Sequence, residues 1–255
     1  MKFAVLRNCL NLGSLATRLL TVIGLLSMAS MAAADTPEQV IAAKLKQARP
    51  DLGVVEVRPS VAEGLYEVQL QGGPVLYSTP DGDFFVLGDL FSVGVGGLVN
   101  LAEQQRDIER KALIAAVDPK DMIIFAAEGQ RRGYVTVFTD VDCFYCQKLH
   151  QEVPVLNKSG IEVRYLAYPR AGVGSDSYRK IASAWCADDP QLAMTALKNR
   201  QPIPDNVCPG NPVADQFMLG QQAGVNGTPA LVLQSGQLVP GYLSAADLTQ
   251  RMGLN

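Results

Sequence analysis

Apolar and polar positions alternate with two different periods in the first third of the chain. In residues 37–48 apolar side chains recur every three to four positions behind Thr36 and Pro37, which predicts a short amphipathic helix. Strand-like runs follow at 53–60, 65–71, 74–79 and 83–88. Asp81-Gly82 predicts a hairpin turn between the last two runs. The pattern predicts a helix followed by a small antiparallel sheet, a module small enough to be stabilised by pairing with a copy of itself.

A glycine-rich stretch at 94–97 and a charged helical pattern separate this module from the rest. Residues 98–117 combine mixed charges with an aliphatic stripe and predict a helix that ends at Asp118-Pro119. We expect this helix to be an exposed connector that holds two domains apart, rather than part of either core.

The last part alternates strand and helix patterns. Strands are predicted at 134–140 and 161–169, helices at 143–156, 176–199, 211–223 and 244–252, and a hairpin at 230–242 that turns at Ser235-Gly236. This order predicts a compact α/β sandwich with a mixed sheet.

The first 34 residues have the layout of a secretory signal peptide. Lys2, Arg7 and Arg18 precede an apolar run from Leu19 to Met28, and small residues lead to a cleavage site after Ala34. The run is about half of the ~20 residues that a membrane span needs, so we expect export and cleavage rather than anchoring. Cleavage removes three cations, no anion and one of the five cysteines.

Composition limits the classes of function that the chain can have. The whole sequence is 48% hydrophobic and has a net charge of −3, which becomes −6 after cleavage, and this argues against binding to nucleic acid. The single histidine makes a histidine metal cage or a Ser-His-Asp triad hard to build. Four cysteines remain, an even number, as oxidising compartments favour.

Cys143-Phe144-Tyr145-Cys146 directly follows a predicted strand and opens a predicted helix. Backbone N–H groups and the helix dipole at such a junction stabilise an anion, which predicts a lowered pKa for an exposed, exchangeable Cys143. Cys146 is one turn further on, shielded by the helix, and within reach to attack a mixed disulfide at Cys143. A C-x-x-C at this position is a strong indication of redox chemistry.

Gly227-Thr228-Pro229 is the second signal, because it directly precedes the apolar strand ALVL. An X-Pro bond at the start of a strand is a candidate for the cis form. The tripeptide is weak evidence alone, but about 80 positions after a junction C-x-x-C it is specific.

With these motifs in place, the chain resembles the DsbC/DsbG family of periplasmic disulfide isomerases. The resemblance rests on VFTDVDCFYCQKLH, VRYLAYPR, SAWCA, GVNGTPALVL and LVPGY and extends over the whole mature chain. It implies an α+β protein with a signal peptide (1–34), a cystatin-like N-terminal dimerisation domain (35–96), a linker helix (97–118) and a thioredoxin-like catalytic domain with a helical insert (119–255).

The resemblance also implies roles for individual residues. Cys143 would be the attacking thiolate, Cys146 the resolving thiol, Thr228-Pro229 the cis-proline loop, and Cys186–Cys208 a structural disulfide. Phe144 and Tyr145 are candidate substrate contacts, although simple exposure would also explain them. No metal or organic cofactor is required; a zinc site is the alternative for the four cysteines, but Cys186 and Cys208 stand 22 positions apart, unlike the close pairs of zinc knuckles.

The chain departs from the family pattern in three ways. Phe144 stands where the family has glycine or proline, and Gln147 where histidine is frequent. Asp142 places a carboxylate next to Cys143 and should oppose thiolate formation unless it turns into solvent.

The only histidine of the sequence, His150, follows Cys146 by four positions on the same predicted helix. It is expected to be a partly exposed bystander rather than a group that modulates a thiol.

The resulting hypothesis is a periplasmic thiol:disulfide isomerase that rearranges incorrect disulfides in misoxidised exported proteins. The family implies a homodimer, a membrane thiol reductase of the DsbD type as electron donor, and chaperone activity in an apolar cleft. Three alternatives stay open: a DsbG-like reductase of single oxidised cysteines, a disulfide-forming oxidase, which the N-terminal module argues against, and a chaperone or binding module with a structural C-x-x-C.

Overall fold

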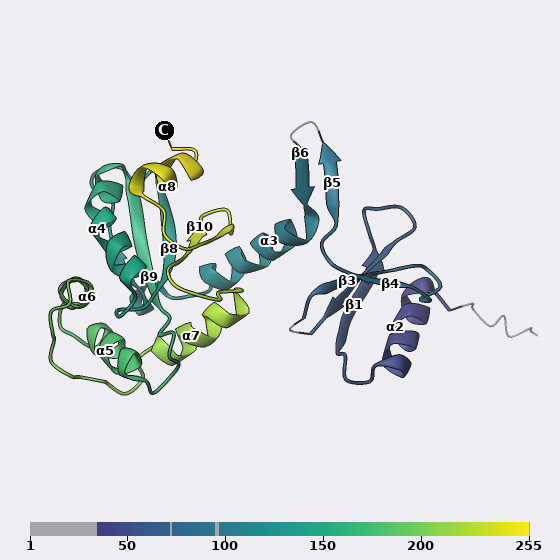
Figure 1. Cartoon of the computed structure of the whole chain (residues 1–255), viewed down its shortest axis with the longest axis horizontal. Helices are drawn as coiled ribbons and strands as arrows, with labels where there is room; N and C mark the ends of the chain where they lie inside the picture. Colours follow the sequence, from purple (N-terminus) through teal and green to yellow (C-terminus); the bar gives the residue numbers. More distant parts are fainter. Residues whose placement is uncertain (1–34, 72, 95–96, 255) are drawn as a thin grey trace, which may run out of the picture. The chain divides into compact units, whose positions relative to one another are not determined.

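The computed structural model describes residues 35–71, 73–94 and 97–254 (Figure 1). They form two compact units: the first holds the residues up to Gln71 together with Tyr77–Val86, and the second holds residues 73–76 and everything from Leu87 onward. The predicted signal peptide lies outside the described residues. Within the described part of the chain, no helix has both the length and the apolarity that crossing a bilayer requires.

The N-terminal elements are one helix and a four-stranded sheet, which confirms the prediction. They are α2 (Pro37–Ala48), β1 (Val54–Pro59), β2 (Tyr66–Leu70), β3 (Val75–Ser78) and β4 (Phe85–Leu87), with the sheet in the order β1-β2-β3-β4. Strands β1 and β2 run antiparallel. The apolar face of α2 buries Ile41 and Leu45, and β2 contributes Val68 and Leu70 to the core.

A hairpin that the sequence pattern did not predict precedes the next helix. Strands β5 (Phe91–Gly94) and β6 (Gly97–Asn100) pair antiparallel, so residues 98–100, predicted as helix, belong to a strand. Helix α3 (Leu101–Ala115) begins only after Asn100, because the Asn100 side chain accepts a hydrogen bond from the N–H of Glu103. Two residues of the predicted flexible stretch, 95 and 96, lie outside the described residues.

The expectation that this helix stays outside either core is wrong for its carboxyl-terminal half. Ile114 is buried with Phe138 and Val225, and the guanidinium of Arg110 donates to the carbonyl oxygens of Ala223 and Gly236, each at 2.8 Å. Gly236 is required for this approach, because a Cβ there would lie 1.9 Å from the carbonyl oxygen of Asp107. The helix is therefore packed against the sheet that follows it.

That sheet has five strands in the order β11-β10-β8-β9-β7. The strands are β7 (Ile123–Phe125), β8 (Gly133–Thr139), β9 (Ile161–Ala167), β10 (Ala230–Leu233) and β11 (Leu238–Pro240). Only β8 and β9 are parallel, which confirms a mixed sheet. The short edge strand β7, which follows a 3-10 turn at Pro119–Asp121, escaped prediction because three residues are too few to show a period.

Alternate strand residues divide the core between the two faces of the sheet. Val135 and Val137 belong to one cluster, which also contains Leu149, Ile181 and Leu248 from helices, and Phe138 belongs to the cluster that contains Ile114. The remaining helices are α4 (Phe144–Lys158), α5 (Asp176–Trp185), α6 (Pro190–Lys198), α7 (Val213–Gln222) and α8 (Ala245–Arg251). The predicted helix 176–199 is two helices, because Asp189 caps a new start at Pro190.

Candidate active site

Cys143 is the residue immediately before α4, four positions after the end of β8. Its carbonyl already accepts a helical hydrogen bond from the N–H of Gln147 at 3.0 Å. The free N–H groups and the positive end of the helix dipole therefore lie at Cys143, as the strand-to-helix pattern predicted.

The sulfur of Cys143 contacts the loop that precedes β10. Its Sγ lies 3.2 Å from the carbonyl oxygen of Thr228, and the Thr228–Pro229 peptide bond is cis. The Thr228 hydroxyl is buried and, among the described residues, has no hydrogen-bond partner. A thiolate at Cys143 would offer that hydroxyl an acceptor.

Cys143 is less accessible than the sequence indicated. The residue is 3% exposed, because the Thr228–Pro229 loop lies against its sulfur, whereas Phe144 and Tyr145 are 60% and 54% exposed. The Tyr145 ring stacks on Tyr242 at a centroid distance of 6.4 Å. The two aromatic residues between the cysteines thus form the exposed part of the motif.

The two free thiols have opposite acidities. A hydrogen bond from the Cys146 thiol, aided by Thr228, the Cys146 N–H and the charge of Arg170, lowers the pKa of Cys143 to about 5 against the opposing effect of burial. Burial, together with the hydrogen bond to Cys143, raises the pKa of Cys146 far above its usual range. Near neutral pH the site therefore holds one thiolate and one thiol.

A buried carboxylate organises the loop before the motif. Asp140 accepts hydrogen bonds from the Ser177 hydroxyl at 2.6 Å, the Arg170 N–H at 2.8 Å and the Asp142 N–H at 2.9 Å. These bonds lower the pKa of Asp140 although burial opposes ionisation. Sequence reasoning missed Asp140, although a carboxylate at the carboxyl end of a predicted strand was a signal.

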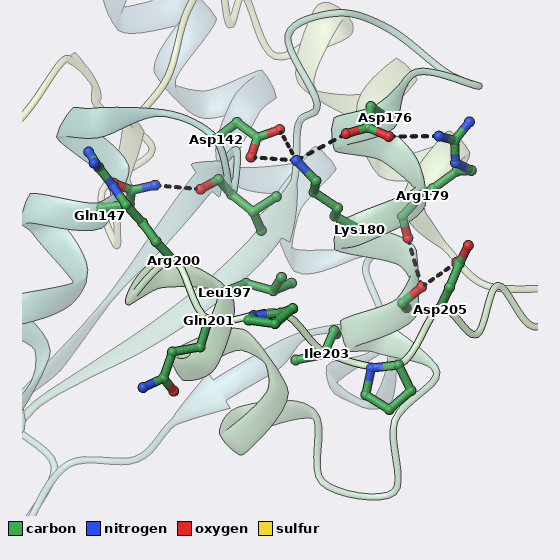
Figure 2. Close-up of a pocket in the computed structure, with 14 residues that line it drawn as sticks. Asp142, Gln147, Asp176, Arg179, Lys180, Leu197, Arg200, Gln201, Ile203 and Asp205 are labelled. Atoms are coloured by element: carbon green, nitrogen blue, oxygen red, sulfur yellow. Dashed lines mark hydrogen bonds and ion pairs between the residues drawn. The ribbon is translucent and has the colours of Figure 1, made fainter.

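Asp142, expected to oppose the thiolate, is turned towards a cation. Its carboxylate lies 3.1 Å from the Lys180 ammonium on α5, and the side chain is about half exposed. Figure 2 shows Lys180 placed between Asp142 and Asp176, and the two carboxylates raise the pKa of Lys180. The condition set by the sequence, that Asp142 turns into solvent, is met in part: its side chain is half exposed and is paired with Lys180.

A fully buried lysine lies behind Cys146. The Lys198 ammonium, from the end of α6, donates to the Thr139 hydroxyl at 2.6 Å and to the Asp140 carbonyl at 2.9 Å, both neutral acceptors. Burial lowers its pKa, and its charge in turn favours a thiolate at Cys146. No spacing in the sequence connects Lys198 with the C-x-x-C motif, because α6 is contributed by the helical insert.

The expectation of a partly exposed His150 is wrong. His150 is buried, with Nδ1 3.0 Å from the Tyr165 hydroxyl and Nε2 3.1 Å from the Thr195 hydroxyl. Burial and the charge of Lys198 lower its pKa to about 4, so the imidazole is neutral at physiological pH. The ring is a hydrogen-bonded part of the core beneath the motif.

The other two cysteines form a disulfide with each other. Cys186 and Cys208 join the end of α5 to the segment before α7, with a Cα–Cα distance of 5.7 Å. Their sulfurs are therefore not available as metal ligands. Among the described residues, no group of three or more His, Cys, Asp or Glu side chains is placed to hold a metal ion.

Known proteins match both parts of the chain. Residues 119–254 match the family model of a thioredoxin-like domain, and residues 32–103 match that of the disulfide bond isomerase protein N-terminal domain. The thiol:disulfide interchange protein DsbC of Escherichia coli K12 is 35% identical over 210 residues, which cover 82% of this chain and 86% of that relative. The DsbC of Pasteurella multocida is 33% identical over 237 residues, which cover 92% and 98%.

Among solved structures, the chain is similar to a disulfide interchange protein from Neisseria gonorrhoeae. That protein is 31% identical, with a TM-score of 0.48 and coverage of 55% of this chain and 98% of the other.

The two domain matches and the two relatives agree with the residues found at the junction of β8 and α4. The thioredoxin-like match contains the free pair Cys143 and Cys146, and the isomerase N-terminal match contains α2 and the four-stranded sheet. Identity above 30% extends over more than four-fifths of the chain. The chain therefore belongs to the DsbC family and is a thiol:disulfide interchange enzyme of the disulfide isomerase class.

Proposed function

We propose that Cys143 is the nucleophile of this enzyme and that Cys146 resolves its covalent intermediates. The observation that supports this assignment is the difference in acidity between the two thiols, with the pKa of Cys143 lowered to about 5 and that of Cys146 strongly raised. The thiolate, not the thiol, attacks a disulfide, so only Cys143 is ready to react near neutral pH.

Isomerisation then follows from thiol–disulfide exchange. The Cys143 thiolate attacks one sulfur of an incorrect disulfide, forms a mixed disulfide and releases the other sulfur as a thiolate. A second substrate thiolate attacks the mixed disulfide, forms the new pairing and returns Cys143 as a thiolate, so no electrons are gained or lost.

Reduction is the alternative exit from the mixed disulfide. Cys146 loses its proton and attacks the Cys143 sulfur, so the Cys143–Cys146 disulfide forms. The substrate sulfur leaves as a thiolate and finally takes up that proton. The substrate has then gained two electrons from the enzyme. The oxidised pair must then be reduced by an external dithiol. We propose a membrane thiol reductase of the DsbD type for this step.

We propose that four residues close to Cys143 in the chain or in the loop against its sulfur contact the substrate. The exposed rings of Phe144 and Tyr145 offer apolar area, and the backbone next to the cis Pro229, at Thr228, can pair with an extended chain. Such contacts recognise an unfolded polypeptide rather than a particular sequence. They also support the proposed chaperone activity towards misoxidised exported proteins.

We further propose a periplasmic homodimer formed through the N-terminal sheet. Strand β4 is at the edge of that sheet, and Phe84, Val86 and Leu87 are between 61% and 70% exposed. An apolar edge strand is a template for pairing with a second copy. Export after cleavage near Ala34 would place the dimer in the periplasm. Sedimentation of the mature chain should give the dimer mass at micromolar concentration; a monomer mass would contradict the proposal.

The decisive experiment for the function is refolding of a scrambled multi-disulfide protein. The mature enzyme with a reducing redox buffer should restore activity to the scrambled protein, and Cys143→Ser should abolish this effect because the nucleophile is lost. Suppression of substrate aggregation should survive the substitution, because it needs only apolar surface. If Cys143→Ser refolds the scrambled protein as well as wild type, the chain acts as a binding module and the assignment of Cys143 is wrong.

A further inference from the structure

A pocket of about 570 Å³ lies directly beside the redox motif. Its walls come from three places: Val141 and Asp142 next to Cys143, the face of α5 with Lys180, and the segment 200–205 (Figure 2). Asp142 and Gln147, which stand on either side of the C-x-x-C motif in the chain, both line the pocket, so it borders the loop before Cys143 and the first turns of α4.

The floor is apolar and the rim is charged but balanced. Its apolar lining residues are Val141, Leu197, Pro202, Ile203 and Pro204, of which Figure 2 labels Leu197 and Ile203. Three acidic and three basic side chains surround them, namely Asp142, Asp176, Asp205, Arg179, Lys180 and Arg200. The pocket therefore selects neither an anion nor a cation, and its interior fits an apolar side chain.

The segment 201–205 offers main-chain hydrogen bonds along one wall. Pro202 and Pro204 favour an extended conformation at Gln201 and Ile203, and no helix or strand includes these residues. Within the described part of the chain, the N–H groups of Ile203 and Asp205 donate no hydrogen bond. Unpaired main-chain donors along an extended wall are the groups that bind an added peptide strand.

Arg200 connects this wall to the helix that holds both cysteines. It is the one residue other than glycine with positive φ in the described part of the chain, at 60°, and this turns the chain from α6 into the extended segment. Its Nε donates to the Gln147 side chain at 2.9 Å, and Gln147 donates to the Val141 carbonyl at 2.9 Å. The wall is thereby held against the residues on either side of the C-x-x-C motif.

A second hollow lies next to the pocket. It has a volume of about 420 Å³ and is lined by Phe144, Lys148 and Gln151, and both hollows share Gln147 and Arg200. Gln147 and Arg200, joined by their hydrogen bond, therefore stand between the two hollows. The two hollows together are called the groove below.

We infer that this groove is a substrate subsite that binds an extended polypeptide segment next to the reacting cysteine, with one apolar side chain in the pocket lined by Leu197 and Ile203. The inference rests on the proposed role of Cys143 and adds to it a determinant of substrate choice. Segments that are unfolded and apolar near a cysteine would react fastest, because folded proteins keep such segments buried.

The test measures the rate at which Cys143 takes up short peptides. Each peptide has one cysteine, activated as a mixed disulfide with thionitrobenzoate, and a single leucine moved through the positions on both sides of that cysteine. The enzyme is Cys146→Ser, so that the peptide remains on Cys143 and thionitrobenzoate release reports the rate. We expect one leucine position to react about tenfold faster than its serine counterpart, as burial of one apolar side chain provides.

Two variants assign the effect to the pocket. Ile203→Ser should remove the leucine preference, whereas Val207→Ser, at an exposed position that follows the segment and lies outside the pocket lining, should keep it. Reaction with glutathione disulfide, which carries no apolar side chain for the pocket, should be equal in all three proteins and shows that each is folded.

If every leucine position reacts at the same rate in a protein that reacts normally with glutathione disulfide, the proposed subsite is wrong, while the role of Cys143 stands. A leucine preference that survives Ile203→Ser would lead to the same conclusion. The scan in the unsubstituted pocket does not depend on the folding of either variant. If Cys143 reacts with neither the peptides nor glutathione disulfide, the proposed nucleophile is wrong and the subsite falls with it.

Discussion

The sulfur of Cys143 lies 3.2 Å from the carbonyl oxygen of Thr228, although 85 positions separate the two residues in the chain. The contact joins the start of α4 to the loop before β10, across the neighbouring strands β8 and β10 of the sheet. Folding thus places the sulfur of the C-x-x-C motif against the main chain of the loop with the cis peptide bond.

Alkylation of Cys143 should follow a thiolate with a pKa of about 5. The rate with iodoacetamide, measured against pH on the reduced protein, should rise with a midpoint near 5 rather than near the ~8.5 of a free cysteine. Cys146→Ala should move the midpoint upward, because it removes the largest cause of the shift. A midpoint that stays in place in Cys146→Ala would contradict this origin.

The same shift predicts how the stability of the reduced protein depends on pH. The pKa of Cys143 is lower in the folded than in the unfolded state, so its thiolate stabilises the folded state fully above the unfolded pKa of ~8.5. This contribution declines below that pH and is lost as pH falls through about 5. Urea unfolding of reduced wild type and Cys143→Ser across this range should show a difference that decreases towards acid.

Lys198→Met should slow the resolving step. The buried ammonium of Lys198 favours the Cys146 thiolate, so its removal raises the pKa of Cys146 further, and one pKa unit is a tenfold loss of thiolate. We expect mixed disulfides at Cys143 to persist about tenfold longer, as measured by acid quenching and mass spectrometry. Lys158→Met, which removes an exposed cation from the far end of α4, should leave their lifetime within about twofold.

Arg110→Met should destabilise the second unit by about 2 kcal/mol. The substitution leaves the carbonyl oxygens of Ala223 and Gly236 without their charged donor in a buried position. Arg106→Met on the same helix removes a half-exposed cation paired with Glu103 and should cost less than about 1 kcal/mol. Urea unfolding of both variants compares their free energies of unfolding. Equal losses would show that the buried hydrogen bonds of Arg110 stabilise the protein no more than the exposed ion pairs of Arg106.

The double substitution Cys186→Ala/Cys208→Ala should lower the free energy of unfolding by about 3 kcal/mol, because the disulfide closes a loop with a sequence separation of 22. Reaction of Cys143 with glutathione disulfide should continue in the folded variant, since the two pairs are separate. Mass mapping of non-reduced peptides should find Cys186 joined to Cys208. A peptide that joins either of them to Cys143 would refute the pairing.

Local patterns predicted most of the elements. The helix at Pro37–Ala48 and the four strands after it follow from the spacing of apolar residues, and the break at Pro190 could have been predicted from Asp189-Pro190. The short strands β5, β6 and β7 were missed, because three or four residues contain too little of any period.

By itself, the sequence determined the chemistry of the site. A C-x-x-C motif at a strand-to-helix junction depends only on neighbouring residues, so Cys143, Cys146 and the likeness to one family could be read directly.

Only the tertiary structure decided how that chemistry is tuned. Burial and electric fields sum over groups from the whole chain: Thr228 and Arg170 act on Cys143, and Lys198 acts on Cys146. The same reason explains the burial of His150 and the packing of Arg110, since each depends on partners at least 15 positions away. A local sequence pattern cannot predict such partners, because they come into contact only when the strands and helices pack together.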